Sequence, residues 1–254
     1  MLFLLLRLMP ALVPLLFFIS TKAAFYYIDE WQWALAAVLI LPLAYFALLK
    51  YKDRSKRIIW PALYAVIFAA TGFVYSLILE NPLIINIYLI SWSLIYALYL
   101  EAFFHDFYET AKVHILDLFN ITHYGNILII FFATAALVSF NIFLNLPWLA
   151  LLVIFAAVCF SVIYLAFERS GLERRHALLY SAVIDLILAE ILGGLLLLPA
   201  SFYVIAAIAA LCYYLLTQTL LYAAGNKLSR KFFIELLGFS ALILIIVAAT
   251  AAWL

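Results

Sequence analysis

Charged residues are scarce in this sequence. Only 11% of the 254 residues are charged, whereas 71% are hydrophobic, and the mean hydropathy is +1.24. Soluble domains contain about 25% charged and about 45–50% apolar residues, so the composition excludes an ordinary soluble domain. Apolar runs of membrane-spanning length follow one another along the whole chain. They predict an all-α, polytopic transmembrane bundle that forms a single integral membrane domain over residues 1–254, surrounded by the lipid bilayer.

The sequence also lacks features typical of disulfide-bonded, zinc-binding and nucleic-acid-binding proteins and of several enzyme classes. The two cysteines, Cys159 and Cys212, lie inside apolar runs, where a thiol behaves as a small hydrophobic group, so we expect neither a disulfide nor a zinc site. The net charge of +1 provides no basic surface for nucleic acid. The H-E-x-x-H, G-x-S-x-G and P-loop motifs do not occur. The sequence therefore predicts no cofactor, and it argues against an enzyme without deciding the matter.

Nine apolar segments are long enough to cross a membrane. The connections between them alternate between long, charged ones and short ones with little charge. Four long connections hold 12 of the 14 Lys and Arg residues, and basic residues stay on the cytoplasmic side during insertion. This pattern predicts a protein of the cell membrane with a cytoplasmic N-terminus and an outer C-terminus. The predicted spans are 3–21, 32–50, 58–79, 82–104, 126–144, 147–167, 177–198, 201–224 and 232–253.

The first segment is predicted to be a retained span. Arg7 interrupts its apolar core, and no basic region precedes it as in a signal peptide. An eight-span arrangement that omits this segment leaves the other spans in place. At the predicted outer turns, Pro82 and Pro147 fall at or beside the first position of the following helix. Asn81 can act as the cap of the helix that begins at Pro82.

The longest connection, between Glu101 and Gly125, contains apolar and polar residues at helical spacing. Its apolar stripe predicts an amphipathic helix around 103–121 that bends out of the fourth span and lies along the cytoplasmic surface. Glu101, His105 and Glu109 follow one another at i, i+4 and i+8, so they are weak candidates for a metal site or for acid–base chemistry. The solvent-exposed face of any interfacial helix has polar residues at this spacing. An ordinary exposed face is therefore a stronger explanation than a metal or acid–base site.

The seventh span contains two carboxylates in an otherwise apolar stretch. At about 1.5 Å per residue, Asp185 lies roughly 13 Å and Glu190 roughly 20 Å from the cytoplasmic end of the span, and they point about 140° apart. A charged group at such depth is costly, by about 2.5–3.5 kcal/mol on insertion scales, and it normally has a partner. No span offers a deep basic residue, since Arg7 lies within about 8 Å of the inner surface.

Asp185 and Glu190 are therefore the candidate residues for binding a substrate or a coupling ion. They can also be neutral acids that hold helices together through hydrogen bonds, and this alternative stays open. Polar residues at suitable depth in other spans are candidate neighbours, namely Thr71, Ser91, Ser93, Tyr213 and Tyr214.

Three functions are compatible with this pattern. The first is a small secondary transporter or lipid-handling carrier that uses an intramembrane carboxylate. The second is a non-catalytic membrane subunit or assembly partner, and the third is a membrane enzyme that acts on a lipid at the cytoplasmic interface. The transporter or carrier ranks first, because an acid at the membrane midplane without a basic partner is typical of ion and proton pathways. Membrane protein partners and further copies of the chain both stay open as partners.

Overall fold

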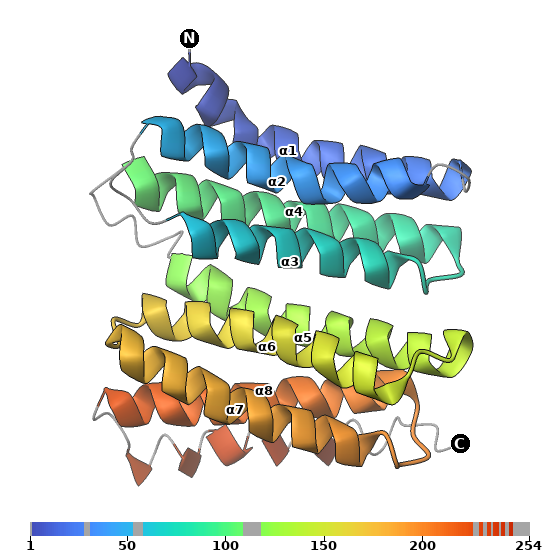
Figure 1. Cartoon of the computed structure of the whole chain (residues 1–254), viewed down its shortest axis with the longest axis vertical. Coiled ribbons are helices and arrows are strands. Elements are labelled where there is room, and N and C mark those ends of the chain that lie inside the picture. The colour runs from blue at the N-terminus through green and yellow to red at the C-terminus, as the bar shows by residue number, and fades with distance from the viewer. Residues whose placement is uncertain are drawn as a thin grey trace. The chain divides into compact units, whose positions relative to one another are not determined.

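The computed structural model describes most of the chain. It covers residues 2–27, 31–52, 58–108 and 118–225, with shorter pieces at 229–230, 233–234, 236–238, 240–241 and 244–245. The described chain folds into eight long helices, and within α1–α4 and within α5–α8 successive helices run in alternating directions (Figure 1). Their bounds are α1 (Leu2–Tyr26), α2 (Trp31–Lys52), α3 (Ile59–Ser76), α4 (Pro82–Tyr108), α5 (Leu118–Leu144), α6 (Trp148–Arg169), α7 (Arg174–Leu195) and α8 (Phe202–Ala224).

All eight helices are long and apolar enough to cross a membrane. The prediction of an all-α, polytopic bundle is thus confirmed, and the first eight predicted spans each correspond to one helix. The ninth predicted span, 232–253, lies mostly outside the described residues. Its described pieces between 233 and 245 are helical, and its crossing of the membrane stays a prediction.

The two turns that are predicted to lie on the outer side have the predicted chemistry. Pro82 is the first residue of α4, and the side chain of Asn81 accepts a hydrogen bond from the backbone N–H of Leu83 at 2.9 Å. Pro147 directly precedes α6. Proline suits these positions because the first N–H groups of a helix have no partner inside the helix.

The structure corrects the two ends of the surface helix predicted around 103–121, and its middle part stays a prediction. Helix α4 continues to Tyr108, and α5 begins at Leu118 rather than at 126. Phe104 and Phe107, which belong to the predicted apolar stripe, are 1% and 6% exposed, so they pack against protein instead of lying on a membrane surface. Residues 109–117 lie outside the described residues.

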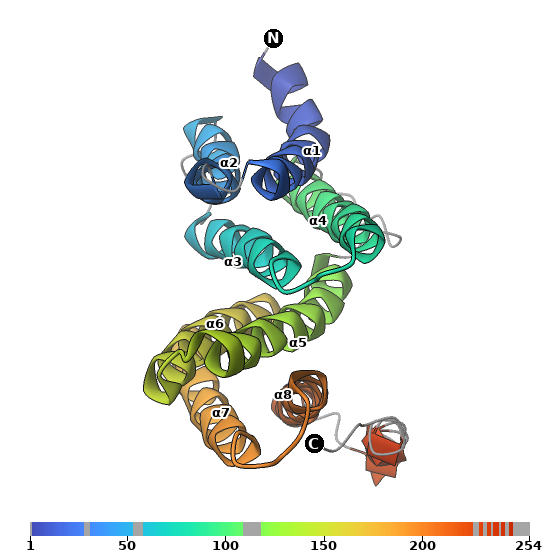
Figure 2. The same ribbon diagram turned by 90° about the vertical axis from the view of Figure 1, so that its right-hand side faces the viewer.

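The contacts divide the chain into two compact units, residues 1–125 and 126–254, with the boundary inside α5. In unit 1, α1 packs on α2, α2 on α3, α3 on α4 and α4 on α1, which closes a ring of four helices (Figure 2). In unit 2, α7 packs against both α6 and α8. The prediction of a single integral membrane domain is not tested by this division and stays a prediction.

Aromatic side chains fill the interior of unit 1. The indole ring of Trp92 stacks on Phe68 with ring centroids 4.3 Å apart, and its Nε1–H donates to the Phe68 carbonyl at 3.1 Å. A Cβ atom at Gly72 would overlap the indole ring of Trp92. Gly72 therefore makes the space in which α4 inserts this ring against α3.

Candidate functional site

Asp185 lies in the middle of α7, on the side that faces α6. Its carboxylate is close to the backbone of α6 at Phe160 and near the Cys159 thiol. The residue is half-buried, but its Oδ1 atom is fully covered and forms no hydrogen bond with any described residue. A buried polar atom without a partner costs about 1–3 kcal/mol, and more if it is charged. Asp185 is therefore expected to lower the free energy of unfolding at this position.

No cation compensates Asp185 within the described part of unit 2. The nearest basic residues on its own helix are Arg174 and Arg175, which are exposed at the N-terminal end. Arg175 lies about 15 Å from Asp185 along the helix axis, at about 1.5 Å per residue. No ion pair between described residues includes Asp185.

Glu190 has different surroundings. It lies on the same helix, one and a half turns farther along, where its side chain is exposed. The two carboxylates thus occupy different environments, and α7 does not join them into one site. Of the other candidate neighbours, Tyr213 and Tyr214 belong to unit 2 with Asp185, whereas Thr71, Ser91 and Ser93 belong to unit 1.

The structure adds one polar residue that sequence reasoning missed. Asn126 is fully buried in α5, and its amide lies beside the Tyr213 hydroxyl of α8. The predicted fifth span began at 126, so Asn126 stood at a helix end, where an amide needs no explanation. Because α5 begins at Leu118, Asn126 instead lies inside the helix.

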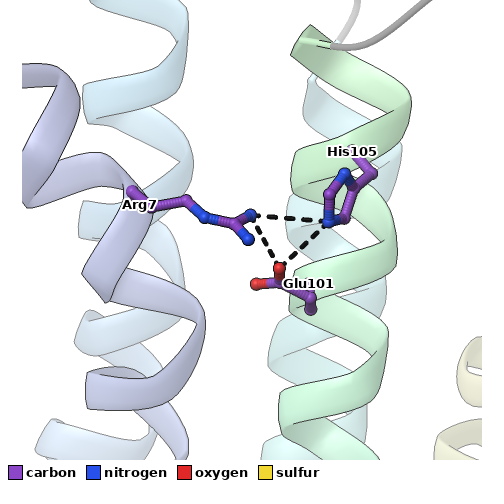
Figure 3. Close-up of polar contacts among 3 residues, drawn as sticks. All are labelled: Arg7, Glu101 and His105. Carbon is purple, nitrogen blue, oxygen red and sulfur yellow. Dashed lines mark hydrogen bonds and ion pairs between the residues drawn. The ribbon is translucent and has the colours of Figure 1, made fainter. Parts of the chain in front are cut away.

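A second polar cluster lies in unit 1 and joins α1 to α4 (Figure 3). Arg7 Nη1 lies 2.7 Å from Glu101 Oε1, and His105 Nε2 lies 3.1 Å from the same oxygen. The guanidinium of Arg7 also lies over the Phe104 ring, 5.2 Å from its centroid. The predicted neighbours Glu101 and His105 therefore lie together. Arg7 joins them from a position 98 residues before His105, which no local pattern indicates.

The two contacts of His105 Nε2 exclude each other. His105 Nε2 also lies 3.4 Å from Arg7 Nη1. Because arginine only donates and an ionised carboxylate only accepts, Nε2 can accept from Arg7 or donate to Glu101, but it cannot do both. The side chains of Arg7, Glu101 and His105 are 46%, 27% and 25% exposed, so the cluster is open to its surroundings.

The cluster is a poor metal site as far as the structure describes it. The described residues contain no group of three or more His, Cys, Asp or Glu side chains that could hold a metal ion. Arg7 already neutralises Glu101 and would repel a second cation. Glu109, the third candidate ligand, lies outside the described residues, so the weak prediction of a metal site stays a prediction.

Comparisons with protein-family models, with curated proteins and with solved structures find no match for this chain. The architecture itself defines the class, which is a multi-pass, membrane-type helical protein.

Proposed function

We propose that the chain is a small secondary transporter or lipid carrier in which Asp185 takes up a proton or a cation as the helices rearrange. The observation that carries the proposal is the covered Oδ1 atom of Asp185, which has no hydrogen-bond partner among the described residues. Ionisable residues inside a membrane usually mark ion or proton pathways. The described residues also give the Asp185 carboxylate no basic partner, so a bound proton or cation is what would compensate its charge.

The proposal includes an orientation. The N-terminus is cytoplasmic, because the basic residues are concentrated in the connections of one side. Asp185 then lies between the two membrane surfaces and out of reach of either.

Reconstituted liposomes provide the test. We expect the parent protein to move protons, Na⁺ or K⁺, each supplied as the driving ion, with proton movement followed by a trapped pH-sensitive dye. Asp185→Asn keeps the shape of the side chain but cannot ionise, and it should lower the rate at least about tenfold, which corresponds to about 1.4 kcal/mol.

Glu190→Gln is the matched control, because it removes an exposed carboxylate from the same helix. It should leave the rate at the parental value. Parental rates in Asp185→Asn for all three ions would refute the proposed role of Asp185.

A further inference from the structure

The cluster of Arg7, Glu101 and His105 connects two helices of unit 1 through one ion pair (Figure 3). Arg7 belongs to α1, whereas Glu101 and His105 lie one helical turn apart on α4. Arg7 Nη1 is 2.7 Å from Glu101 Oε1 and 3.4 Å from His105 Nε2. The attraction between α1 and α4 at this point therefore depends on the combined charge of the two side chains on α4.

Protonation of His105 changes this combined charge. While the imidazole is neutral, the Glu101 carboxylate gives the pair on α4 a net negative charge, which attracts the Arg7 guanidinium. An imidazolium cancels that charge. Histidine is the side chain that ordinarily gains a proton between about pH 8 and about pH 5. Acidification over this range therefore removes the net charge on α4 that holds Arg7.

The same proton also removes a hydrogen-bond acceptor from Arg7. A neutral imidazole has one nitrogen that accepts, whereas both nitrogens of an imidazolium donate. His105 Nε2 can then only donate, and the Glu101 Oε1 atom at 3.1 Å accepts from it. Toward Arg7 Nη1 at 3.4 Å it presents a second cation instead of an acceptor. Protonation thus strengthens the contact within α4 and weakens the contact with α1.

The other titratable groups around the cluster do not reverse this effect. Helices α1 and α3 pack on α4, and Lys22, the second basic residue of α1, contacts the opposite end of α4. Asp106, next to His105, is exposed, so solvent screens its charge. The other titratable side chains that the structure describes on α2, on α3 and at the end of α4 are tyrosines, which carry no charge below about pH 9. They are Tyr45, Tyr64, Tyr75 and Tyr108.

We propose that His105 is a pH sensor that weakens the docking of α1 on α4 when it takes up a proton. Arg7 and His105 both lie toward the predicted cytoplasmic ends of their helices, so the sensor responds to the pH of the cytoplasm. The proposal does not rest on the role of Asp185, which belongs to the other unit.

The unfolding midpoint of Arg7→Gln in detergent tests the proposal at two pH values. The substitution keeps a long polar side chain but removes the charge. At about pH 8 it should lower the thermal midpoint by about 1–3 °C relative to the parent, as expected for a partly exposed ion pair. At about pH 5.5 the loss should be at most about half as large, because the protonated His105 already opposes Arg7. A chelator is present throughout, so that no divalent cation replaces the proton on His105.

His105→Gln is the background that removes only the titration. Glutamine places a neutral amide near the position of Nε2 and cannot gain a charge, so Arg7→Gln should cause the same loss at both pH values in this background. His176→Gln is the matched control. His176 Nδ1 also lies near a carboxylate, 3.3 Å from Glu173 Oε2, but this exposed pair belongs to unit 2. In the His176→Gln background, the loss should depend on pH as it does in the parent.

Two results would overturn the proposal. The first is a loss in Arg7→Gln that is equal at the two pH values or larger at about pH 5.5. The second is a pH-dependent loss that persists in the His105→Gln background, because the titration would then belong to another group, such as Glu101.

Discussion

Asp185 and Glu190 lie on one helix but differ in what surrounds them. The sequence alone identifies both, because a carboxylate in an apolar run is visible without a structure. It cannot say which of them is covered, since that depends on the helix packed against α7. In the structure α6 covers one oxygen of Asp185, while Glu190 is exposed. Asp185 is therefore the stronger candidate of the two.

The cluster of Arg7, Glu101 and His105 also shows that the sequence predicts contacts within a helix but not contacts between helices. The spacing of Glu101 and His105 predicts their contact, because residues i and i+4 are neighbours on a helix. Arg7 comes from another helix, and its place beside Glu101 depends on how α1 packs on α4.

We expect Glu101→Gln to destabilise the protein only slightly. The substitution removes the charge that Arg7 contacts, but both side chains are partly exposed, so the loss should stay below about 1 kcal/mol. Denaturant unfolding in detergent measures this difference, and Glu80→Gln, at an exposed position before α4, is the control. A loss of several kcal/mol would show that the ion pair is far stronger than its exposure allows.

At the scale of helices, α3 and α4 show what hydropathy can and cannot predict. The predicted fourth span ended at 104, because His105 and Asp106 interrupt the apolar run, yet α4 continues to Tyr108. Its last turns stay helical because Phe104 and Phe107 are buried in unit 1. Hydropathy indicates where a span lies, whereas tertiary packing decides where its helix ends.

Gly72 provides a test of the packing between α3 and α4. Gly72→Ala places a methyl group where Trp92 Nε1 now lies, so the indole ring must move away from Phe68. Overpacking of this kind costs about 1–3 kcal/mol, and the hydrogen bond to the Phe68 carbonyl would be lost as well. We expect a lower unfolding midpoint and a changed tryptophan fluorescence spectrum.

Gly193→Ala is the matched control for Gly72→Ala. A Cβ atom at Gly193 meets nothing within 4 Å, and alanine favours a helix over glycine by up to about 1 kcal/mol. This variant should be as stable as the parent or slightly more stable. Equal stability of the two alanine variants would contradict the packing assigned to Trp92.

At the scale of the whole molecule, the sequence predicts the order and the approximate bounds of eight of its nine expected spans well. Apolar length and the prolines in the short turns before α4 and α6 are local signals, so eight predicted spans match eight helices. The grouping of these helices into two units is not visible in the sequence, because it depends on contacts between segments far apart along the chain. The side on which each turn lies is a prediction from the basic residues.

Labelling of single introduced cysteines in intact cells tests this orientation. Glu80 lies exposed in the turn before α4, and Ser170 lies exposed in the turn between α6 and α7. A membrane-impermeant maleimide should label Glu80→Cys in intact cells, and Ser170→Cys only after the membrane is permeabilised. The reverse pattern would contradict the predicted orientation. The native Cys159 is 0% exposed, and the parent protein gives the background signal.

The infrared difference spectrum of the reconstituted protein tests the role of Asp185 most directly. We expect the carbonyl band of protonated carboxylic acids to change between about pH 3 and about pH 9, with one component from Asp185 because it exchanges its proton. This component should persist in Glu190→Gln and be lost in Asp185→Asn. An unchanged difference spectrum in Asp185→Asn would show that Asp185 does not exchange a proton, and would contradict its role as a proton-binding residue.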